Sequence, residues 1–158
     1  MERYDGDMRI PFFKQRTNEY CGPAVLQMTL RAYGVRATQT RLAEEAGTNT
    51  ARGTTLAGVV RALRKHGLHV DAAHKRTIAQ VRKALRARKL VIICYTERAW
   101  NWGHYSIVRG FRGKYILLQD PAEHDGKTAP FTIEEFEKRW YDNKFTRSVR
   151  WAAFVSEK

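Results

Sequence analysis

Residues 15–34 read QRTNEYCGPAVLQMTLRAYG, a polar loop followed by apolar side chains at helical spacing. This spacing predicts a helix from Cys21 to Tyr33, and Gly34 is placed to end it. Pro23 fits the first turn of such a helix, because the N–H that proline lacks would have no intrahelical partner there. The chain therefore places a cysteine at the start of a helix.

The chain up to residue 89 continues with the same helical period. Threonines precede the apolar runs and glycines follow two of them, as N-caps and C-terminal stops do. We expect three further helices: Thr38–Ala46 before Gly47, a helix capped by Thr54 and ended at Gly67, and one capped by Thr77 with Ile78, Val81 and Leu85 on one face.

From residue 90 onward the pattern changes to short runs of β-forming residues. Such runs indicate strands, and the Arg112-Gly113 pair indicates a hairpin turn. Helices followed by antiparallel strands predict an α+β domain, with a helical half at about residues 20–89 and a sheet half at about 90–156. The expected elements are strands at Leu90–Tyr95, His104–Phe111 and Lys114–Gln119, a helix at Thr132–Tyr141 with Thr132 and Glu135 as a capping box, and a strand at Arg150–Val155 that closes the sheet.

The composition fits a single domain spanning residues 1–158. A hydrophobic fraction of 43% is too high for a disordered polycation. No stretch approaches the roughly 20 apolar residues of a membrane helix, and Met1–Ile10 lacks the basic start of a secretory signal. Two cysteines are too few for a disulfide scaffold or a cysteine-rich zinc module. We expect a soluble, cytoplasmic domain that needs no cofactor or metal, with non-standard export left open.

The net charge of +13 is concentrated in one segment. Residues 52–89 hold eleven basic side chains and one acidic side chain, a balance of +10. A helical face of one sign implies an anionic partner, such as an acidic protein, a membrane surface or nucleic acid. The segment has no aromatic residue for base stacking, so nucleic acid is not favoured. The alternative is an ordinary solvated helix surface; the candidate residues are Arg61, Arg64, Arg82, Arg86 and Lys89.

Cys21 is the candidate nucleophile. A thiol at a helix N-terminus faces the positive end of the helix dipole and free backbone N–H groups, which favour the reactive thiolate. The alternative is a small buried residue near a helix end. Gln15, six residues earlier in the loop, is a candidate donor that would join the Cys21 N–H in stabilising an oxyanion.

His104 and Asp120 are expected to be neighbours, because they lie at the start and the end of two strands joined by a hairpin. A carboxylate beside an imidazole fixes its tautomer and orientation, as in a nucleophile–base–orienter triad. The alternatives are a hydrogen-bonded structural histidine and an ordinary turn aspartate before proline.

Trp100 and Trp102 flank the approach to His104. They either form a wall of a substrate groove beside the imidazole or plug the end of the sheet. Together with Tyr20, which directly precedes Cys21, they are the candidate substrate-binding residues.

His66, His69 and His74 fall in a stretch expected to be a loop between helices. Their spacing raises the possibility of a metal site, but Asp71 is the one carboxylate nearby and no cysteine is close in sequence. Solvated loop histidines are the favoured interpretation. Cys94 lies inside an apolar strand and is expected to be buried and inert.

Three segments taken together resemble a known family. They are residues 15–24 (QRTNEYCGPA), 104–108 (HYSIV) and 119–122 (QDPA). This combination resembles the bacteriocin-processing peptidases of the papain-like clan, the double-glycine leader peptidases found on peptide-exporting ABC transporters and as stand-alone relatives. The resemblance spans about residues 11–141 and includes the segments Gly53–Leu56 and Phe131–Trp140.

The resemblance implies a papain-like fold, with N-terminal helices packed on a C-terminal antiparallel sheet, and a peptide or protein substrate. It also implies Cys21 as nucleophile, His104 as general acid and base, Asp120 as the residue that orients His104, and Gln15 as oxyanion donor. The sequence departs from the family at position 16, where arginine replaces a small hydroxyl residue, and at position 20, where tyrosine replaces an acidic residue. Residues 142–158 also match poorly.

Two other functions remain open from the sequence. The same Cys21–His104 pair serves deamidation or amide transfer on a target protein, as in a toxin, because these reactions share an acyl-enzyme. Alternatively, the chain is a non-catalytic module that binds an acidic partner or nucleic acid through residues 52–89.

Overall fold

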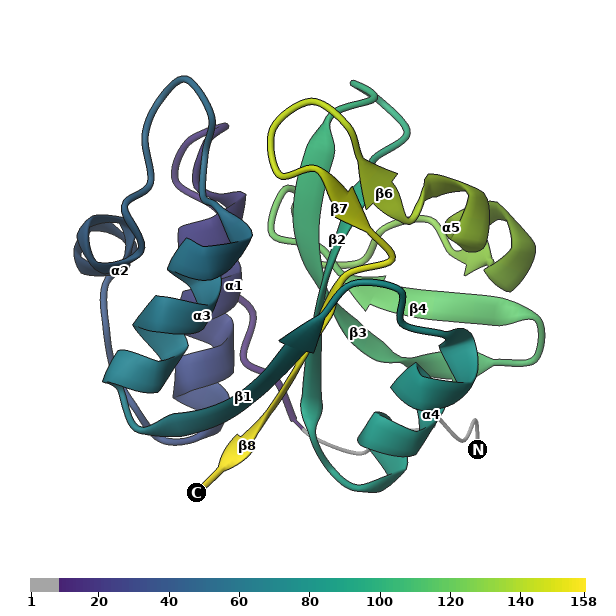
Figure 1. Cartoon of the computed structure of the whole chain (residues 1–158), viewed down its shortest axis with the longest axis horizontal. Coiled ribbons are helices and arrows are strands. Elements are labelled where there is room, and N and C mark those ends of the chain that lie inside the picture. The colour runs from purple at the N-terminus through teal and green to yellow at the C-terminus, as the bar shows by residue number, and fades with distance from the viewer. Residues whose placement is uncertain (1–8) are drawn as a thin grey trace.

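The computed structural model describes residues 9–158, so most of the expectation for Met1–Ile10 lies outside the described residues. In this part of the chain, three helices lie on one side of a central sheet and two on the other (Figure 1). The helices are α1 (Cys21–Ala32), α2 (Gln39–Ala46), α3 (Leu56–Lys65), α4 (Ile78–Arg86) and α5 (Ile133–Arg139). This arrangement confirms the predicted α+β class.

The helix boundaries follow the expected capping residues in most cases. The Thr38 hydroxyl accepts the N–H of Arg41 to begin α2, and Gly47 ends it in the left-handed conformation with φ of 67°. Thr77 and Gln80 form a reciprocal capping box at α4. The prediction that Thr54 caps the next helix was wrong, because Thr55 accepts the first-turn N–H of α3.

A six-stranded antiparallel sheet runs through the centre in the order β1-β8-β2-β3-β4-β5, and a small β6–β7 hairpin lies beside it. The segment between α3 and α4 was expected to be a loop and is instead strand β1. The last strand does not close the sheet, because β8 lies between β1 and β2. The strands are β1 (Leu68–Ala73), β2 (Leu90–Thr96), β3 (Gly103–Arg112), β4 (Tyr115–Gln119), β5 (Phe131–Thr132), β6 (Tyr141–Asp142), β7 (Ser148–Val149) and β8 (Ala152–Glu157).

The β3–β4 hairpin differs in detail from the prediction. Arg112 pairs with Tyr115, so the turn consists of Gly113 and Lys114 rather than Arg112 and Gly113. A bulge between Val108 and Gly110 then shifts the register by one residue. Continuing the pairing by one residue beyond Ile107–Gln119 places Asp120 opposite Ser106. Ser106 is two residues from His104 on β3, so the side chains of Ser106 and His104 point to the same face of the sheet.

The two faces of the sheet bury separate hydrophobic clusters, because successive residues of a strand point to opposite sides. On β2, Ile92 and Cys94 pack with α1 and α3, whereas Val91 and Ile93 pack with α4 and α5. Each face of the sheet is therefore covered by helices.

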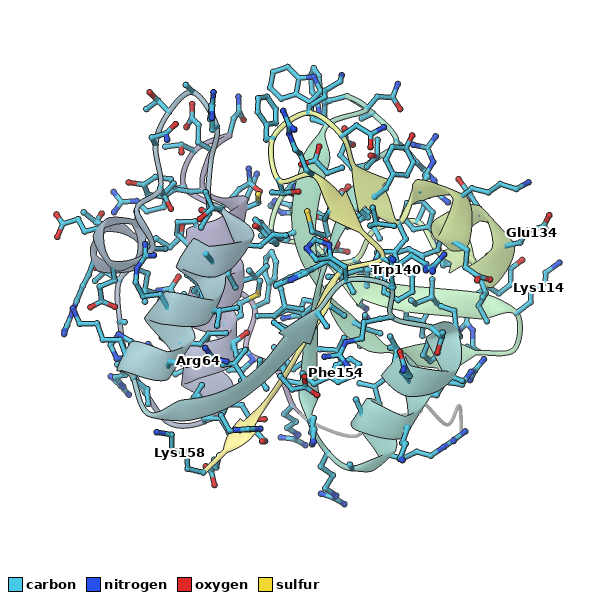
Figure 2. The ribbon with its side chains drawn as sticks, in the orientation of Figure 1. Arg64, Lys114, Glu134, Trp140, Phe154 and Lys158 are labelled. Atoms are coloured by element: carbon cyan, nitrogen blue, oxygen red, sulfur yellow. The ribbon has the colours of Figure 1, made fainter. Side chains whose placement is uncertain are left out.

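This division separates the basic residues that the sequence analysis placed on one face. Arg61 and Arg64 belong to α3, whereas Arg82 and Arg86 belong to α4 on the other face, with Lys89 just after it. Figure 2 shows Arg64 beside α3, away from Phe154, which packs with the α4 cluster. The expectation of one continuous basic face was wrong, because helical periodicity does not state which side of a sheet a helix covers.

Some of these arginines also serve structural contacts. The Arg64 guanidinium donates to the Val70 carbonyl at 3.0 Å, which ties α3 to β1. The Arg82 guanidinium stacks over the Phe111 ring, 4.1 Å from its centroid. Part of the basic charge therefore helps to hold helices onto the sheet.

Within residues 9–158, no helix combines the length and the apolar character needed to cross a bilayer.

Candidate active site

Cys21 is the first residue of α1, as the sequence predicts. Tyr20 is the N-cap residue, and its side chain makes no capping hydrogen bond. The first-turn N–H groups of α1 therefore keep donor capacity for another group, and the helix dipole adds partial positive charge there. Cys21 is 9% exposed and belongs to the hydrophobic cluster beneath α1.

His104 and Asp120 form a buried pair. The His104 Nε2 atom lies 2.6 Å from the Asp120 Oδ1 atom, and both residues are less than a tenth exposed. The predicted proximity is therefore confirmed. The side chain of Cys21 also lies close enough to the His104 ring to raise its pKa. Because Nε2 faces Asp120, the remaining nitrogen, Nδ1, is the one available to the thiol.

The surroundings of this pair favour a protonated imidazole. Burial by itself lowers the pKa of His104, but the hydrogen bond to Asp120 and the nearby Cys21 side chain outweigh it and hold that pKa well above the ordinary value. Burial raises the pKa of Asp120, and its hydrogen bond with His104 outweighs that effect, so the net direction is down. The Ala122 N–H also donates to Asp120 Oδ1 at 2.9 Å. The ring thus lies between a carboxylate and a thiol.

Gln15 is anchored beside the same turn. Its backbone N–H donates to the Pro121 carbonyl at 2.9 Å. Its side-chain Nε2 donates to the carbonyls of Thr17 at 2.9 Å and Asn18 at 3.4 Å, while its buried Oε1 has no hydrogen-bond partner among the described residues. The amide is thus held by its own loop in this conformation, and its role as oxyanion donor stays a prediction.

A contact that sequence reasoning missed joins the strand of His104 to the helix of Cys21. The buried Tyr105 hydroxyl donates to the Thr54 carbonyl at 2.8 Å. Thr54 in turn packs against Gly22, where an added Cβ would lie 2.3 Å from the Thr54 hydroxyl oxygen. The Gly-Pro pair after Cys21 was visible in the sequence, but it does not indicate that Gly22 packs against Thr54.

Replacing Gly22 by alanine should destabilise the protein by about 1–3 kcal/mol, the usual cost of forcing an extra carbon into a packed site. The added Cβ must displace Thr54 or shift the first turn of α1. Thermal unfolding measures the loss. In a Thr54→Gly background, Gly22→Ala should lower the free energy of unfolding by clearly less. An equal loss of stability in both backgrounds would show that the contact with Thr54 is not the cause.

The candidate substrate-binding residues differ in exposure. Trp100 and Trp102 belong to the loop between β2 and β3 and are 76% and 57% exposed. This exposure is inconsistent with a plug at the end of the sheet. Tyr20 is partly buried at the start of α1. Their contact with substrate stays a prediction.

The three histidines considered as metal ligands have separate partners. His66 Nε2 lies 2.6 Å from a Glu45 carboxylate oxygen, and His74 Nδ1 accepts the Val149 N–H. His69 lies on β1 rather than in a loop. No group of three potential metal ligands gathers anywhere in residues 9–158. Cys94 is buried as expected, and burial raises its pKa to about 12.

Comparison with known proteins gives matches along most of the chain. An uncharacterized protein of Methanothermobacter thermautotrophicus is 33% identical over 102 residues, which cover 65% of this chain and 65% of that protein. The lactococcin-G-processing and transport ATP-binding protein LagD of Lactococcus lactis subsp. lactis is 31% identical over 126 residues, 80% of this chain and 17% of LagD. The chain thus spans a small part of the transport protein and about two thirds of the archaeal one.

Solved structures match the fold. The peptidase domain of Streptococcus ComA, a bifunctional ABC transporter involved in quorum sensing, superposes with a TM-score of 0.75 at 23% identity, covering 95% of this chain and all of that domain. A double-glycine motif protease from an AMS/PCAT transporter, solved in complex with the leader peptide, superposes with a TM-score of 0.71 at 22% identity. The match covers 97% of this chain and 95% of that protein. The model of the Peptidase C39 family matches residues 9–147. The chain therefore belongs to the Peptidase C39 family.

Proposed function

We propose that this chain is a cysteine peptidase that cleaves a leader or precursor peptide with Cys21, His104 and Asp120. The observation that carries the proposal is the buried His104 ring, whose Nε2 atom lies 2.6 Å from Asp120 Oδ1 and whose pKa is raised by both Asp120 and Cys21, the first residue of α1. A nucleophile, a base and a group that orients the base are the parts that covalent acyl transfer needs.

The proposed reaction begins with a thiolate on Cys21 and a proton on His104. Sγ attacks the peptide carbonyl, and the developing oxyanion accepts hydrogen bonds from the Cys21 N–H and from Gln15 once its amide turns away from the loop carbonyls. His104 then gives its proton to the leaving amine. In the second half, His104 takes a proton from water, and the resulting hydroxide displaces Cys21 from the thioester to release the acid product.

Family membership supports a peptide substrate of the leader kind. The matched relative LagD is a bacteriocin-processing and transport protein, and one structural match was solved with a leader peptide. On this basis the proposed scissile bond follows a Gly-Gly pair. The replacements at Arg16 and Tyr20 leave the nucleophile, the imidazole and the carboxylate in place.

The test uses an internally quenched peptide with a central Gly-Gly pair and mass spectrometry of the products. Hydrolysis should give two fragments whose masses add up to the peptide plus one water, at a rate typical of enzymes, on the order of 1–100 s⁻¹. An intact peptide that gains about one dalton indicates deamidation by the same acyl-enzyme chemistry and contradicts the proposal. A Gly-Gly to Val-Val peptide is the matched control for the cleavage site.

A further inference from the structure

Two loops beside His104 carry the large apolar side chains that the fold leaves exposed. Among residues 9–158, the exposed large hydrophobic side chains all lie in the β2–β3 loop or in the β6–β7 hairpin. They are Trp100, Trp102, Tyr141, Phe145 and Val149. The rings of Trp102 and Phe145 meet edge to face, with centroids 6.1 Å apart. The two loops, which lie at the top of Figure 1, are thus joined by an aromatic contact, and we call their exposed side chains the aromatic surface.

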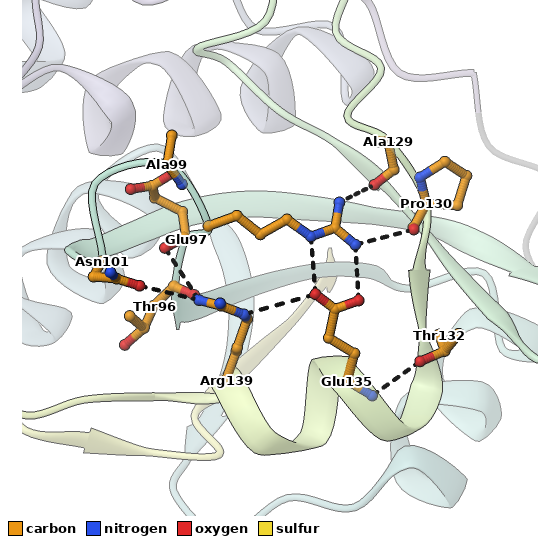
Figure 3. A network of polar contacts seen from close by, with 10 residues as sticks. Thr96, Glu97, Ala99, Asn101, Ala129, Pro130, Thr132, Glu135 and Arg139 are labelled. Carbon is orange, nitrogen blue, oxygen red and sulfur yellow. Dashed lines mark hydrogen bonds and ion pairs between the residues drawn. The ribbon is translucent and has the colours of Figure 1, made fainter.

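The β2–β3 loop is held in place by an ion-pair network (Figure 3). Arg98 makes a two-pronged pair with Glu135, with both N···O distances at 2.9 Å, and also donates to the carbonyls of Ala129 and Pro130. Arg139 donates to loop acceptors on Thr96, Glu97 and Asn101. These bonds order the loop before any ligand arrives, which lowers the entropic cost of binding through its tryptophans.

The β6–β7 hairpin is held by a buried carboxylate. Asp142 accepts the backbone N–H groups of Lys144, Phe145 and Thr146. The same carboxylate packs against Gly103, where an added Cβ would lie 2.3 Å from Oδ2. Because Gly103 directly precedes His104, this contact fixes the hairpin next to the candidate base.

Basic side chains lie on the β6–β7 side of this surface. Lys144 and Arg147 lie on the exposed turn of the hairpin, and Lys75 lies alongside, with its N–H bonded to the Val149 carbonyl. In the described part of the chain none of these three has an acidic partner within salt-bridge distance. In the β2–β3 loop, the Glu97 carboxylate accepts the backbone N–H groups of Ala99 and Trp100. The unpaired basic side chains therefore lie on the hairpin side of the aromatic surface.

We propose that Trp100, Trp102 and Phe145, with Lys144 and Arg147, bind an acidic segment with apolar side chains in the peptide substrate, a few residues from the scissile bond. This inference rests on the proposed peptidase function. Trp102 is two residues from His104, so the two Cα atoms are at most about 7 Å apart. A substrate that passes His104 reaches the surface within roughly two to five residues, and the positive rim selects for carboxylates.

The test compares internally quenched Gly-Gly peptides that carry Glu-Leu-Glu-Phe, Ser-Leu-Ser-Phe or Lys-Leu-Lys-Phe on one side of the cleaved bond, with both sides tried. The wild type should show a KM about 10-fold lower for the acidic peptide than for the neutral one, and the difference should shrink as salt is added. A double variant, Lys144→Glu with Arg147→Glu, should prefer the basic peptide over the acidic one. Lys114→Glu with Lys158→Glu, a charge-matched pair on other parts of the surface (Figure 2), should keep the preference for the acidic peptide.

The aromatic contribution is tested separately. Trp100→Ala with Trp102→Ala should raise KM for the acidic and the neutral peptide alike by about 10-fold, the scale of losing one or two interface aromatics, with little change in kcat. An unchanged KM in this variant would overturn the aromatic part of the proposal.

A binding experiment separates this proposal from the function on which it rests. Fluorescence anisotropy of the same peptides with the Cys21→Ala variant needs no turnover. Cleavage without charge preference would overturn the docking surface and leave the peptidase proposal intact. Charge-dependent binding with no cleavage by the wild type would support the surface and overturn the peptidase proposal. Tighter binding of oligothymidylate, or of vesicles with phosphatidylglycerol, would overturn the assignment to a peptide.

Discussion

Replacing Cys21 by alanine should abolish cleavage of the Gly-Gly peptide, lowering kcat/KM by about 10⁴-fold or more, the scale seen when a covalent nucleophile is removed. Removing Sγ leaves no group to form the thioester. Cys94→Ala is the matched control, since it removes the other thiol of the chain, which lies in strand β2. That variant should keep its turnover while losing some stability through the cavity it creates.

Alkylation with iodoacetamide at neutral pH distinguishes the two thiols directly. Cys21 should react quickly, because it lies at a helix N-terminus beside His104, whereas burial raises the pKa of Cys94 to about 12 and keeps it protonated. Peptide mapping by mass spectrometry locates the label. Equal, slow modification of both thiols would contradict an activated nucleophile at position 21.

The second large effect is expected for Asp120→Asn, with a loss in kcat of about 10³–10⁴-fold. The amide keeps the size of the side chain, and its oxygen can still accept the Ala122 N–H that Asp120 Oδ1 now accepts at 2.9 Å. The same oxygen position also faces His104 Nε2, 2.6 Å away, so the amide oxygen can accept both N–H groups. It carries no negative charge, however, and therefore no longer stabilises the imidazolium that forms when His104 holds the Cys21 proton.

The pH dependence of the cleavage rate should also change in the Asp120→Asn variant. Hydrogen bonding to Asp120 raises the pKa of His104, so the wild-type imidazolium persists as the pH rises. Without the carboxylate the pKa of His104 falls, the proton leaves at lower pH, and the alkaline limb of the rate profile moves toward acid. Asp71→Asn, which alters an exposed carboxylate paired with Arg76, should leave the profile unchanged. An unshifted alkaline limb in Asp120→Asn would contradict the assigned role.

Local signals in the sequence were enough to locate the candidate nucleophile. The apolar period, Gly22-Pro23 and Gly34 define α1 within a residue or two, because helix caps and the first-turn proline act within one turn of the chain. The closeness of His104 and Asp120 also followed from one hairpin. The turn and the bulge each differed from the prediction. The two residues still meet, because an imidazole ring can reach a diagonal position on the neighbouring strand.

Local patterns in the sequence were sufficient to predict the five helices and four of the eight strands of residues 9–158, the α+β class and the residues able to carry the chemistry. Three features became known from the fold alone: β8 lies in the middle of the sheet, α3 and α4 cover opposite faces, and the β6–β7 hairpin contacts the loop before His104. The difference arises from the sequence separation of the interacting residues. Periodicity and capping depend on residues within a turn or two, whereas strand order and helix placement depend on which distant apolar surfaces bury each other. A count of charges along the chain therefore pointed to residues 52–89, while the fold gathers aromatic and basic side chains at the candidate site.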